Sequence, residues 1–423
     1  MDDRRPGRAG PAGPQGHRRG HHTQDGRGYV STHEESRLAR VALTWLAEPG
    51  TRSVYGLVNE IGPVATLELL LDGGAPQEKL RDSVAARTRA GDARAVATES
   101  LRRADRLGAR LVTPDDDEWP MTVEQLRHLR LDLPGKPRRV DIETDPPLCF
   151  WVRGAWRLDE ALERSVAVVG ARAATPYGLH VATDLAYGLA DREWTVVSGG
   201  AFGIDAAAHR GALTAGGLTV AVLACGVDRP YPLGNTALFD RIAETGLLVS
   251  EWPPAAEPLR PRFLIRNRVI AAATRGTVLV EAAARSGATQ TTRRALALNK
   301  RAMVVPGPVT SAMSVGAHEI LREEPAARLV TGLAQVLEEV GPIGELAPVP
   351  RGPERPADLL DDDARAVLES LPRRGALGVD DIAARAGLAV RTVLRTLPLL
   401  EELSFVVRRE DGYALVASAA GRS

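Results

Sequence analysis

The chain has 423 residues, equal numbers of basic and acidic side chains, and a formal net charge of zero. This length predicts two or three domains, and the zero net charge means that any nucleic-acid surface would have to be a local basic patch. Two cysteines are too few for a disulfide framework or a zinc site by themselves, and the lack of a long apolar run or a signal-peptide core predicts a cytoplasmic protein.

The N-terminal third divides into a tail and a helical domain. Residues 1–30 are mostly Gly, Pro, Arg and His and are expected to form a disordered basic tail, which either contacts nucleic acid or is simply solvated. Residues 31–130 are expected to form a helical domain of the SAM or helix-hairpin-helix type, because apolar residues recur at helical spacing. Gly62 and Pro63 predict a turn between two of its helices. Such a hairpin could hold a DNA phosphate, although a plain turn is the interpretation we favour.

The segment 145–341 has the pattern of an α/β domain. Near-continuous apolar runs occur at 166–169, 195–197, 218–223, 247–249, 277–280 and 302–305, preceded by an entry strand within 145–152. Helix-length segments separate the six runs, which predicts a doubly wound parallel sheet. Ligands of such sheets bind at the carboxyl ends of the strands, so the loops that follow the strands are the candidate functional segments.

Four of these segments carry unusual residues. The first, 169–178, places Arg172 ahead of a predicted helix start at Thr175 and Pro176. The second is the glycine turn at 198–203, and the third, 260–268, holds four arginines and Phe263. In the fourth, 281–289, Ser286 is a candidate helix cap. Arginine side chains and backbone amides bind phosphates without reading sequence, and a phenylalanine can stack on any base.

The glycine turn, SGGAFGIDAAAH at 198–209, is the segment around which we expect the domain to be organised. Its glycines leave backbone N–H groups accessible, and the helix that follows contributes free N-terminal donors and the positive end of its dipole. This combination predicts a phosphate cradle, whereas the alternative is an ordinary strand-to-helix turn.

Several catalytic patterns are missing from the sequence. The first strand is not followed by a G-x-G-x-x-G fingerprint, and the Gly135-Lys136 pair is followed by proline, so no Walker A loop is present. No zinc-protease motif occurs. Asp205 and His209 would share a helix face, but we interpret them as a structural pair rather than a catalytic couple. The sequence therefore predicts no enzyme activity, no cofactor and no metal.

The C-terminal part is set off by a proline-rich linker at 342–357. Residues 358–417 follow as three short helices and a hairpin with an Asp411-Gly412 turn signal, the order of a winged helix. Arg391 and Arg395 would lie one turn apart on its recognition helix, with Pro398 as a possible kink. A protein-contact role for this module is as well supported as DNA binding.

The motifs together resemble the DprA/Smf family of DNA-processing proteins. The resemblance rests on GAR at 170–172, YG at 177–178, SGGAFGIDAAAH at 198–209, GVDRPYPLGN at 226–235, SEWPP at 250–254, FLIRNR at 263–268, EAAARSG at 281–287 and VPG at 305–307. It spans residues 145–331 and implies an extended Rossmann-like domain. The sequence departs from the family at 288–292 and at 316–318, which affects the expected contacts of the fourth segment.

What the resemblance implies is a homodimer that binds single-stranded DNA and loads a RecA-type recombinase during natural transformation. It implies DNA contacts by residues of the four segments and by one lysine, namely Gly170, Arg172, Ser198, Gly199, Gly200, Arg260, Phe263, Arg266, Asn267, Arg268, Ser286, Gly287 and Lys300. The alternative for Arg266 and Arg268 is ion pairing with Glu251 or Glu281. Two other classes stay open, a nucleotide-binding enzyme of the phosphoribohydrolase type, whose Pro-Gly-Gly-x-Gly-Thr loop is missing, and a winged-helix transcription regulator.

Overall fold

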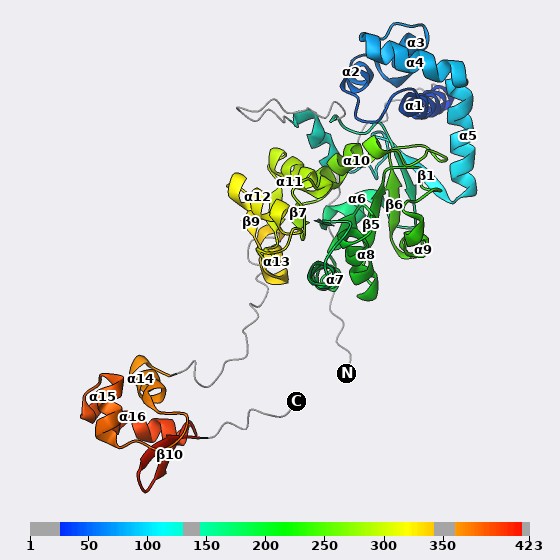
Figure 1. Cartoon of the computed structure of the whole chain (residues 1–423). Helices are drawn as coiled ribbons and strands as arrows, with labels where there is room; N and C mark the ends of the chain where they lie inside the picture. The colour runs from blue at the N-terminus through cyan, green and yellow to red at the C-terminus, as the bar shows by residue number, and fades with distance from the viewer. Residues whose placement is uncertain (1–25, 130–143, 342–359, 417–423) are drawn as a thin grey trace, which may run out of the picture. The chain divides into compact units, whose positions relative to one another are not determined.

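The computed structural model describes residues 26–129, 144–341 and 360–416 (Figure 1). Contacts between residues divide the chain into two compact units, Met1–Ala347 and Pro348–Ser423. Residues 1–25 of the predicted tail lie outside the described residues, whereas residues 26–30 belong to the first helix rather than to a tail. The predicted linker at 342–357 lies outside the described residues entirely.

The N-terminal part of the first unit is helical, as its apolar spacing predicts. It contains α1 (Gly26–Leu46), α2 (Arg52–Ile61), α3 (Pro63–Leu71), α4 (Glu78–Ala90) and α5 (Ala93–Arg106). Gly62 separates α2 from α3 at φ 82°, a left-handed conformation that glycine adopts without strain, and Pro63 starts the next helix. The turn predicted at this position is therefore present.

A strand that the sequence pattern did not reveal joins this helical part to the sheet. Strand β1 (Ala109–Val112) pairs antiparallel with β2 (Phe150–Arg153), and β2 pairs antiparallel with β6 (Leu247–Ser250). Between β1 and β2 lies the 3-10 helix η1 (Met121–His128), and α6 (Leu158–Glu163) follows β2. The edge of the sheet thus falls inside the segment that we expected to be wholly helical.

The predicted parallel strands all form. They are β3 (Ser165–Val169), β4 (Thr195–Ser198), β5 (Thr219–Leu223), β6, β7 (Gly276–Leu279) and β8 (Arg301–Val304), with the two-residue β9 (Arg328–Leu329) at the edge. The nine strands are ordered β1-β2-β6-β5-β4-β3-β7-β8-β9, and every pairing from β6 to β9 is parallel. Strands β3 to β7 are fully buried and β8 is buried beyond Arg301, which explains their continuous apolar composition, whereas both residues of β9 are exposed.

The helices between the strands are α7 (Pro176–Ala190), α8 (Ile204–Thr214), η2 (Leu233–Asn235), α9 (Thr236–Thr245), α10 (Arg260–Ala273), α11 (Gly287–Ala297), α12 (Val315–Glu323) and α13 (Leu333–Val340). One buried cluster joins α7, α8 and α13 to the sheet, and another joins α6, α10 and α12 to it. Apolar clusters thus cover both sides of the sheet, which confirms the doubly wound α/β fold. One local expectation was wrong, because 260–268 is the first half of helix α10 rather than a loop.

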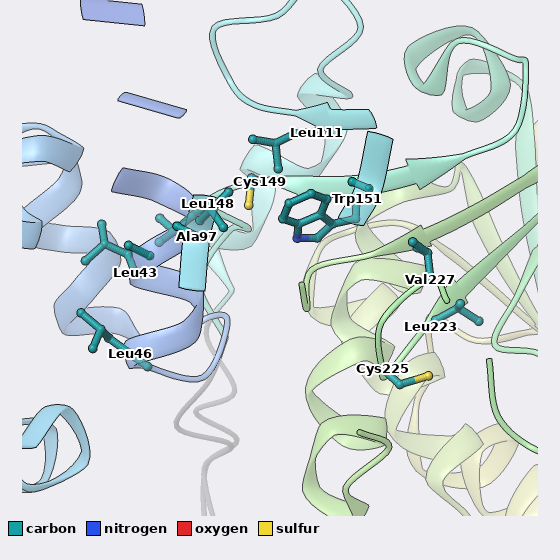
Figure 2. Close-up of a cluster of buried hydrophobic side chains, with 14 of the residues drawn as sticks. Leu43, Leu46, Ala97, Leu111, Leu148, Cys149, Trp151, Leu223, Cys225 and Val227 are labelled. Atoms are coloured by element: carbon teal, nitrogen blue, oxygen red, sulfur yellow. The ribbon is translucent and has the colours of Figure 1, made fainter. Parts of the chain in front are cut away.

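The N-terminal helices share a core with the sheet (Figure 2). Leu43 and Leu46 of α1 belong to the same buried cluster as Trp151 of β2 and Leu223 of β5. Cys149 and Cys225 are also buried in this cluster as free thiols, and burial raises the pKa of Cys149 to about 12. The helical part is therefore packed against the sheet through a continuous apolar contact.

The order in which successive strands are added to the sheet changes direction at β3. From β3 the order runs through β4 and β5 to β6 on one side, and through β7 and β8 to β9 on the other. The point between β3 and β7 is thus a topological switch, where the loops at the carboxyl ends diverge and leave a crevice.

The second unit contains α14 (Asp362–Ser370), α15 (Val379–Ala386), α16 (Val390–Glu402) and the hairpin of β10 (Val406–Arg409) and β11 (Gly412–Leu415). This order confirms the predicted winged helix. Pro398 lies inside α16. Arg409 pairs with Gly412, so the two turn residues are Glu410 and Asp411, one position earlier than the turn signal suggested.

Candidate functional site

A cavity of about 800 Å³ lies at the carboxyl ends of the strands. It is lined by the loops after β3, β4 and β5, by the first turns of α10 and by the segment that leads from β7 into α11. Its volume is typical of pockets that enclose a small ligand. The predicted site residues that line it are Gly170, Arg172, Arg260, Phe263, Arg266, Asn267, Ser286 and Gly287.

An aromatic ring with a cation over it stands in this cavity. The guanidinium carbon of Arg172 lies 5.0 Å from the centroid of the Phe263 ring. The ring of Tyr231 meets Phe263 in an edge contact, with centroids 5.8 Å apart and planes at 63°. Tyr231 is exposed and Phe263 half-buried, so both present part of their surface to a ligand. A flat π-system would find two rings and a planar cation to stack against.

Arg266 forms the floor of the cavity and is almost fully buried. Its Nη1 donates to the carbonyl oxygen of Gly199 at 2.9 Å and to that of Val222, and its Nε donates to Asn267 Oδ1 at 3.0 Å. Burial lowers its pKa to about 10, and the nearby carboxylate of Asp205 opposes this decrease. Arg266 therefore remains charged at neutral pH and ties the loop after β4 and strand β5 to α10.

The glycine turn is not an open phosphate cradle, which corrects the expectation from its sequence. The backbone N–H groups of Gly199 and Ala201 donate to Asp205 Oδ2, at 3.2 and 3.4 Å. Asp205 is buried, which raises its pKa, while Arg266 and these hydrogen bonds lower it. The loop thus already holds an internal carboxylate. A Cβ on Gly199 would meet the Arg266 guanidinium, so this glycine serves to let the arginine approach.

Arg268 does not line the cavity, and the expectation that it binds DNA is corrected. Its side chain is fully buried, and its Nη2 lies 2.6 Å from Glu251 Oε1. The neighbouring Arg262 also points away from the cavity, donating to both carboxylate oxygens of Glu48 in the turn after α1. The ion-pairing alternative therefore applies to Arg268 with Glu251, whereas Arg266 lines the cavity.

Three further predicted residues also lie elsewhere. Ser198 is buried and donates from its hydroxyl to Val168 O at 2.7 Å. Gly200 is covered by Phe239, whose ring would meet a Cβ at this position. Lys300 donates to the carbonyl oxygens of Ala272 and Thr274 near the end of α10, and burial lowers its pKa to about 8. These residues stabilise the elements behind the cavity rather than its surface.

Both predicted helix caps are present. Thr175 accepts from the N–H of Gly178 at the start of α7, and Ser286 accepts from the N–H of Ala288 at the start of α11. Glu281, two residues after β7, accepts from Thr175 N at 2.9 Å and from its hydroxyl at 2.5 Å. This buried carboxylate fixes the loop that carries Arg172.

Sequence reasoning missed several cavity residues, among them Tyr231, Arg285 and Asp205. Arg285 and Tyr231 follow β7 and β5, so the rule that ligands bind at carboxyl ends could have included them. Within the described ranges, the exposed Arg172, Arg260 and Arg285 form no ion pair with a carboxylate. Three uncompensated cations therefore surround the aromatic pair, a combination suited to an anionic, aromatic ligand.

His209 and Asp205 are both buried on α8, and each forms hydrogen bonds within the fold. The hydroxyl of Thr219 donates to Val196 O at 2.7 Å, so its oxygen accepts from His209 Nδ1, also at 2.7 Å. Burial, with the nearby Arg266 and Arg210, lowers the pKa of His209 from 6.5 to about 3. The folded protein thus keeps this imidazole neutral.

We expect His209 to make the protein sensitive to acid. Below pH 6.5 the imidazole of His209 binds a proton in the unfolded chain. In the folded protein it stays neutral until the pH falls to about 3. Stability contributed by His209 is therefore lost as pH falls, at about 1.4 kcal/mol per pH unit in this window. Denaturant titrations of the wild type and His209→Asn at several pH values measure this loss. As the pH falls, the wild type should lose unfolding free energy relative to the variant, which has no imidazole to protonate. A pH-independent difference would contradict it.

The chain matches the family model described as DNA recombination-mediator protein A over residues 110–341, and the DprA winged helix domain over 351–412. The DNA processing protein DprA of Mycobacterium tuberculosis is 44% identical over 383 residues, which cover 90% of this chain and 95% of that protein. Protein Smf of Escherichia coli is 34% identical and covers 70% of this chain and 80% of that protein.

A solved structure shows a similar fold. The X-ray structure of DNA processing protein A from Streptococcus pneumoniae aligns with a TM-score of 0.55 at 28% identity, covering 74% of this chain and 96% of that one. In the part of this chain that the structure describes, no helix has the length and apolar character to cross a membrane.

Proposed function

Since the chain belongs to the DNA recombination-mediator protein A (DprA) family of DNA-processing proteins, we propose that it binds single-stranded DNA in the cavity between β3 and β7. The observation that supports this most is the pairing of Phe263 and Tyr231 with Arg172, Arg260 and Arg285 around one cavity. Exposed rings accept unpaired bases, and guanidinium groups hold phosphates without reading sequence.

The same arrangement disfavours duplex DNA as the ligand. In a duplex each base is stacked on its neighbours and cannot reach a ring inside a cavity without leaving the stack. A single strand turns its bases outward at little cost, so stacking on Phe263 selects for it. Contacts to phosphates by Arg172 and Arg260 then contribute affinity that is independent of sequence.

We propose further, from family membership, that the protein acts as a homodimer in the cytoplasm and transfers the bound strand to a RecA-type recombinase during recombination or natural transformation. In this role the chain needs no catalysis of its own. Strand exchange by the recombinase on DNA covered with single-strand binding protein should be faster when this protein is added. DNA-stimulated ATP hydrolysis by this protein alone would argue for an enzyme instead.

The experiment that tests the binding proposal compares three ligands by fluorescence anisotropy at one salt concentration. A labelled oligothymidylate should bind at least tenfold more tightly than a duplex of the same length, and a mononucleotide should compete weakly. Equal affinity for the mononucleotide would favour a nucleotide-binding enzyme on this fold. Equal affinity for the duplex, lost on deletion of residues 358–417, would place the DNA site in the winged helix.

A further inference from the structure

A second depression lies beside the main cavity. It has a volume of about 380 Å³ and is lined by residues of α8, of the η2 turn and of α9. Arg210 of α8 and Arg241 of α9 stand in its wall, and both are exposed. Neither forms an ion pair with a carboxylate in the described part of the chain. Two exposed guanidinium groups thus flank a surface hollow that the main cavity does not include.

The two hollows share one wall. Asn235, which lines the second depression, donates from Nδ2 to the carbonyl oxygens of Gly200 and Ala201, at 3.0 and 3.4 Å. Ala201 lines the main cavity. The loop after β4 and the turn at η2 are therefore bonded together, and the ridge they form separates the hollows by only a few residues.

An exposed aromatic ring lies on this ridge. Phe202, in the loop just before α8, is 49% exposed, and phenylalanine is scarce in this chain. A Cβ on Gly234 would lie 3.0 Å from Phe202 Cζ, so the ring rests against the η2 turn. Tyr231, just before that turn, lines the main cavity and is also exposed. Exposed rings thus continue from the main cavity toward the second depression.

We propose that a single DNA strand leaves the main cavity over Phe202 and that its phosphates continue to Arg210 and Arg241. This inference rests on the proposed function, and it assigns the second depression to the same ligand class, a flexible polyanion with aromatic bases. Phe202 offers a stacking surface at the crossing point, and the arginine pair neutralises phosphates beyond it. The site therefore binds longer strands more tightly than the main cavity alone can.

The test compares short and long strands in variants of the second depression. Oligothymidylates of about 4 and about 16 nucleotides span the range of site sizes known for single-strand binders. The double variant Arg210→Gln, Arg241→Gln should bind the short strand like the wild type. Its plot of log affinity against log salt for the long strand should be flatter by about 1.4 units, because about 0.7 unit is lost per phosphate contact. Phe202→Ala should weaken long-strand binding by about 5- to 150-fold with the slope unchanged.

Matched variants separate the outcomes. Arg210→Lys with Arg241→Lys keeps both charges and should restore the slope. Arg192→Gln removes an exposed arginine that precedes β4, at the opposite end of the β-strands. It should leave the affinity for both the short and the long oligonucleotide unchanged. If the wild type fails to bind the short strand, the proposed function fails. If the wild type binds the short strand, two results would contradict the extended path. One is a wild-type salt slope of the double variant on the long strand, and the other is an equal loss of affinity of the double variant for the short and the long strand.

Discussion

Arg268→Met should destabilise the first unit by about 3–5 kcal/mol, on the order of 10 °C in apparent Tm, without changing how DNA binding depends on salt. Arg268 and Glu251 form an ion pair that is almost completely shielded from water. Burial raises the pKa of Glu251 and the charge of Arg268 lowers it, so removing the arginine leaves a buried carboxylate without its partner. Thermal unfolding and a salt titration of single-strand binding measure the two effects on the same preparation.

A double variant separates charge from packing. Arg268→Met combined with Glu251→Leu removes both buried charges and should recover most of the lost stability, because an apolar pair of similar volume needs no desolvation of charge. Gly50 packs its backbone over the guanidinium of Arg268, and a Cβ there would lie 2.7 Å from Arg268 Nε, so Gly50→Ala should destabilise as well. A stable Arg268→Met variant with a flattened salt plot would show that Arg268 contacts DNA after all.

Arg172→Ala and Arg260→Ala should each weaken single-strand binding and flatten the salt plot by about 0.7 unit, because each removes one phosphate contact. Phe263→Ala should cost about 1–3 kcal/mol of binding free energy with little change in slope, since stacking releases few counterions. Arg172 also lies over the Phe263 ring. Arg172→Lys should therefore keep the slope and lose part of the affinity, because lysine keeps the charge without a planar group.

The matched control for these variants is Arg192→Ala, an exposed residue shortly before β4, at the amino ends of the strands. All five proteins should unfold at nearly the wild-type temperature, because Arg172 and Arg260 are exposed and Phe263 is half-buried. Loss of stability in step with loss of affinity would instead mean that these side chains support the fold.

Much of this site could be predicted because strand positions follow from composition. The buried parallel strands are continuous apolar runs, so their carboxyl ends could be located to within about a residue, and with them the loop of Arg172. Local capping signals at Thr175 and Ser286 were equally readable, because they depend only on neighbouring backbone groups.

The arginines of α10 were harder to assign. This helix is packed on more than one side, so its sequence shows no single polar face that would sort its four arginines. Phe263, Arg266 and Asn267 share one face and line the cavity, whereas Arg262 and Arg268 meet Glu48 and Glu251. Glu48 lies more than 200 residues away in sequence, so only the packing of the N-terminal helices on α10 reveals the division.

The glycine turn failed as a prediction for a related reason. Its open amides do bind a carboxylate, but the carboxylate is that of Asp205, six residues later on α8. The motif predicted the chemistry of the turn correctly and could not show that the chain fills it internally.

The central claim is that single-stranded DNA binds in the cavity around Phe263, and photo-crosslinking tests it most directly. An oligonucleotide carrying 5-iodouracil in place of thymine, which crosslinks to nearby aromatic side chains, would be irradiated with the full-length protein and the modified peptide sequenced by mass spectrometry. The account predicts crosslinks at Phe263 or Tyr231, and their loss in Phe263→Ala and Tyr231→Ala. Crosslinks confined to residues 358–417, with none at Phe263 or Tyr231, would contradict it.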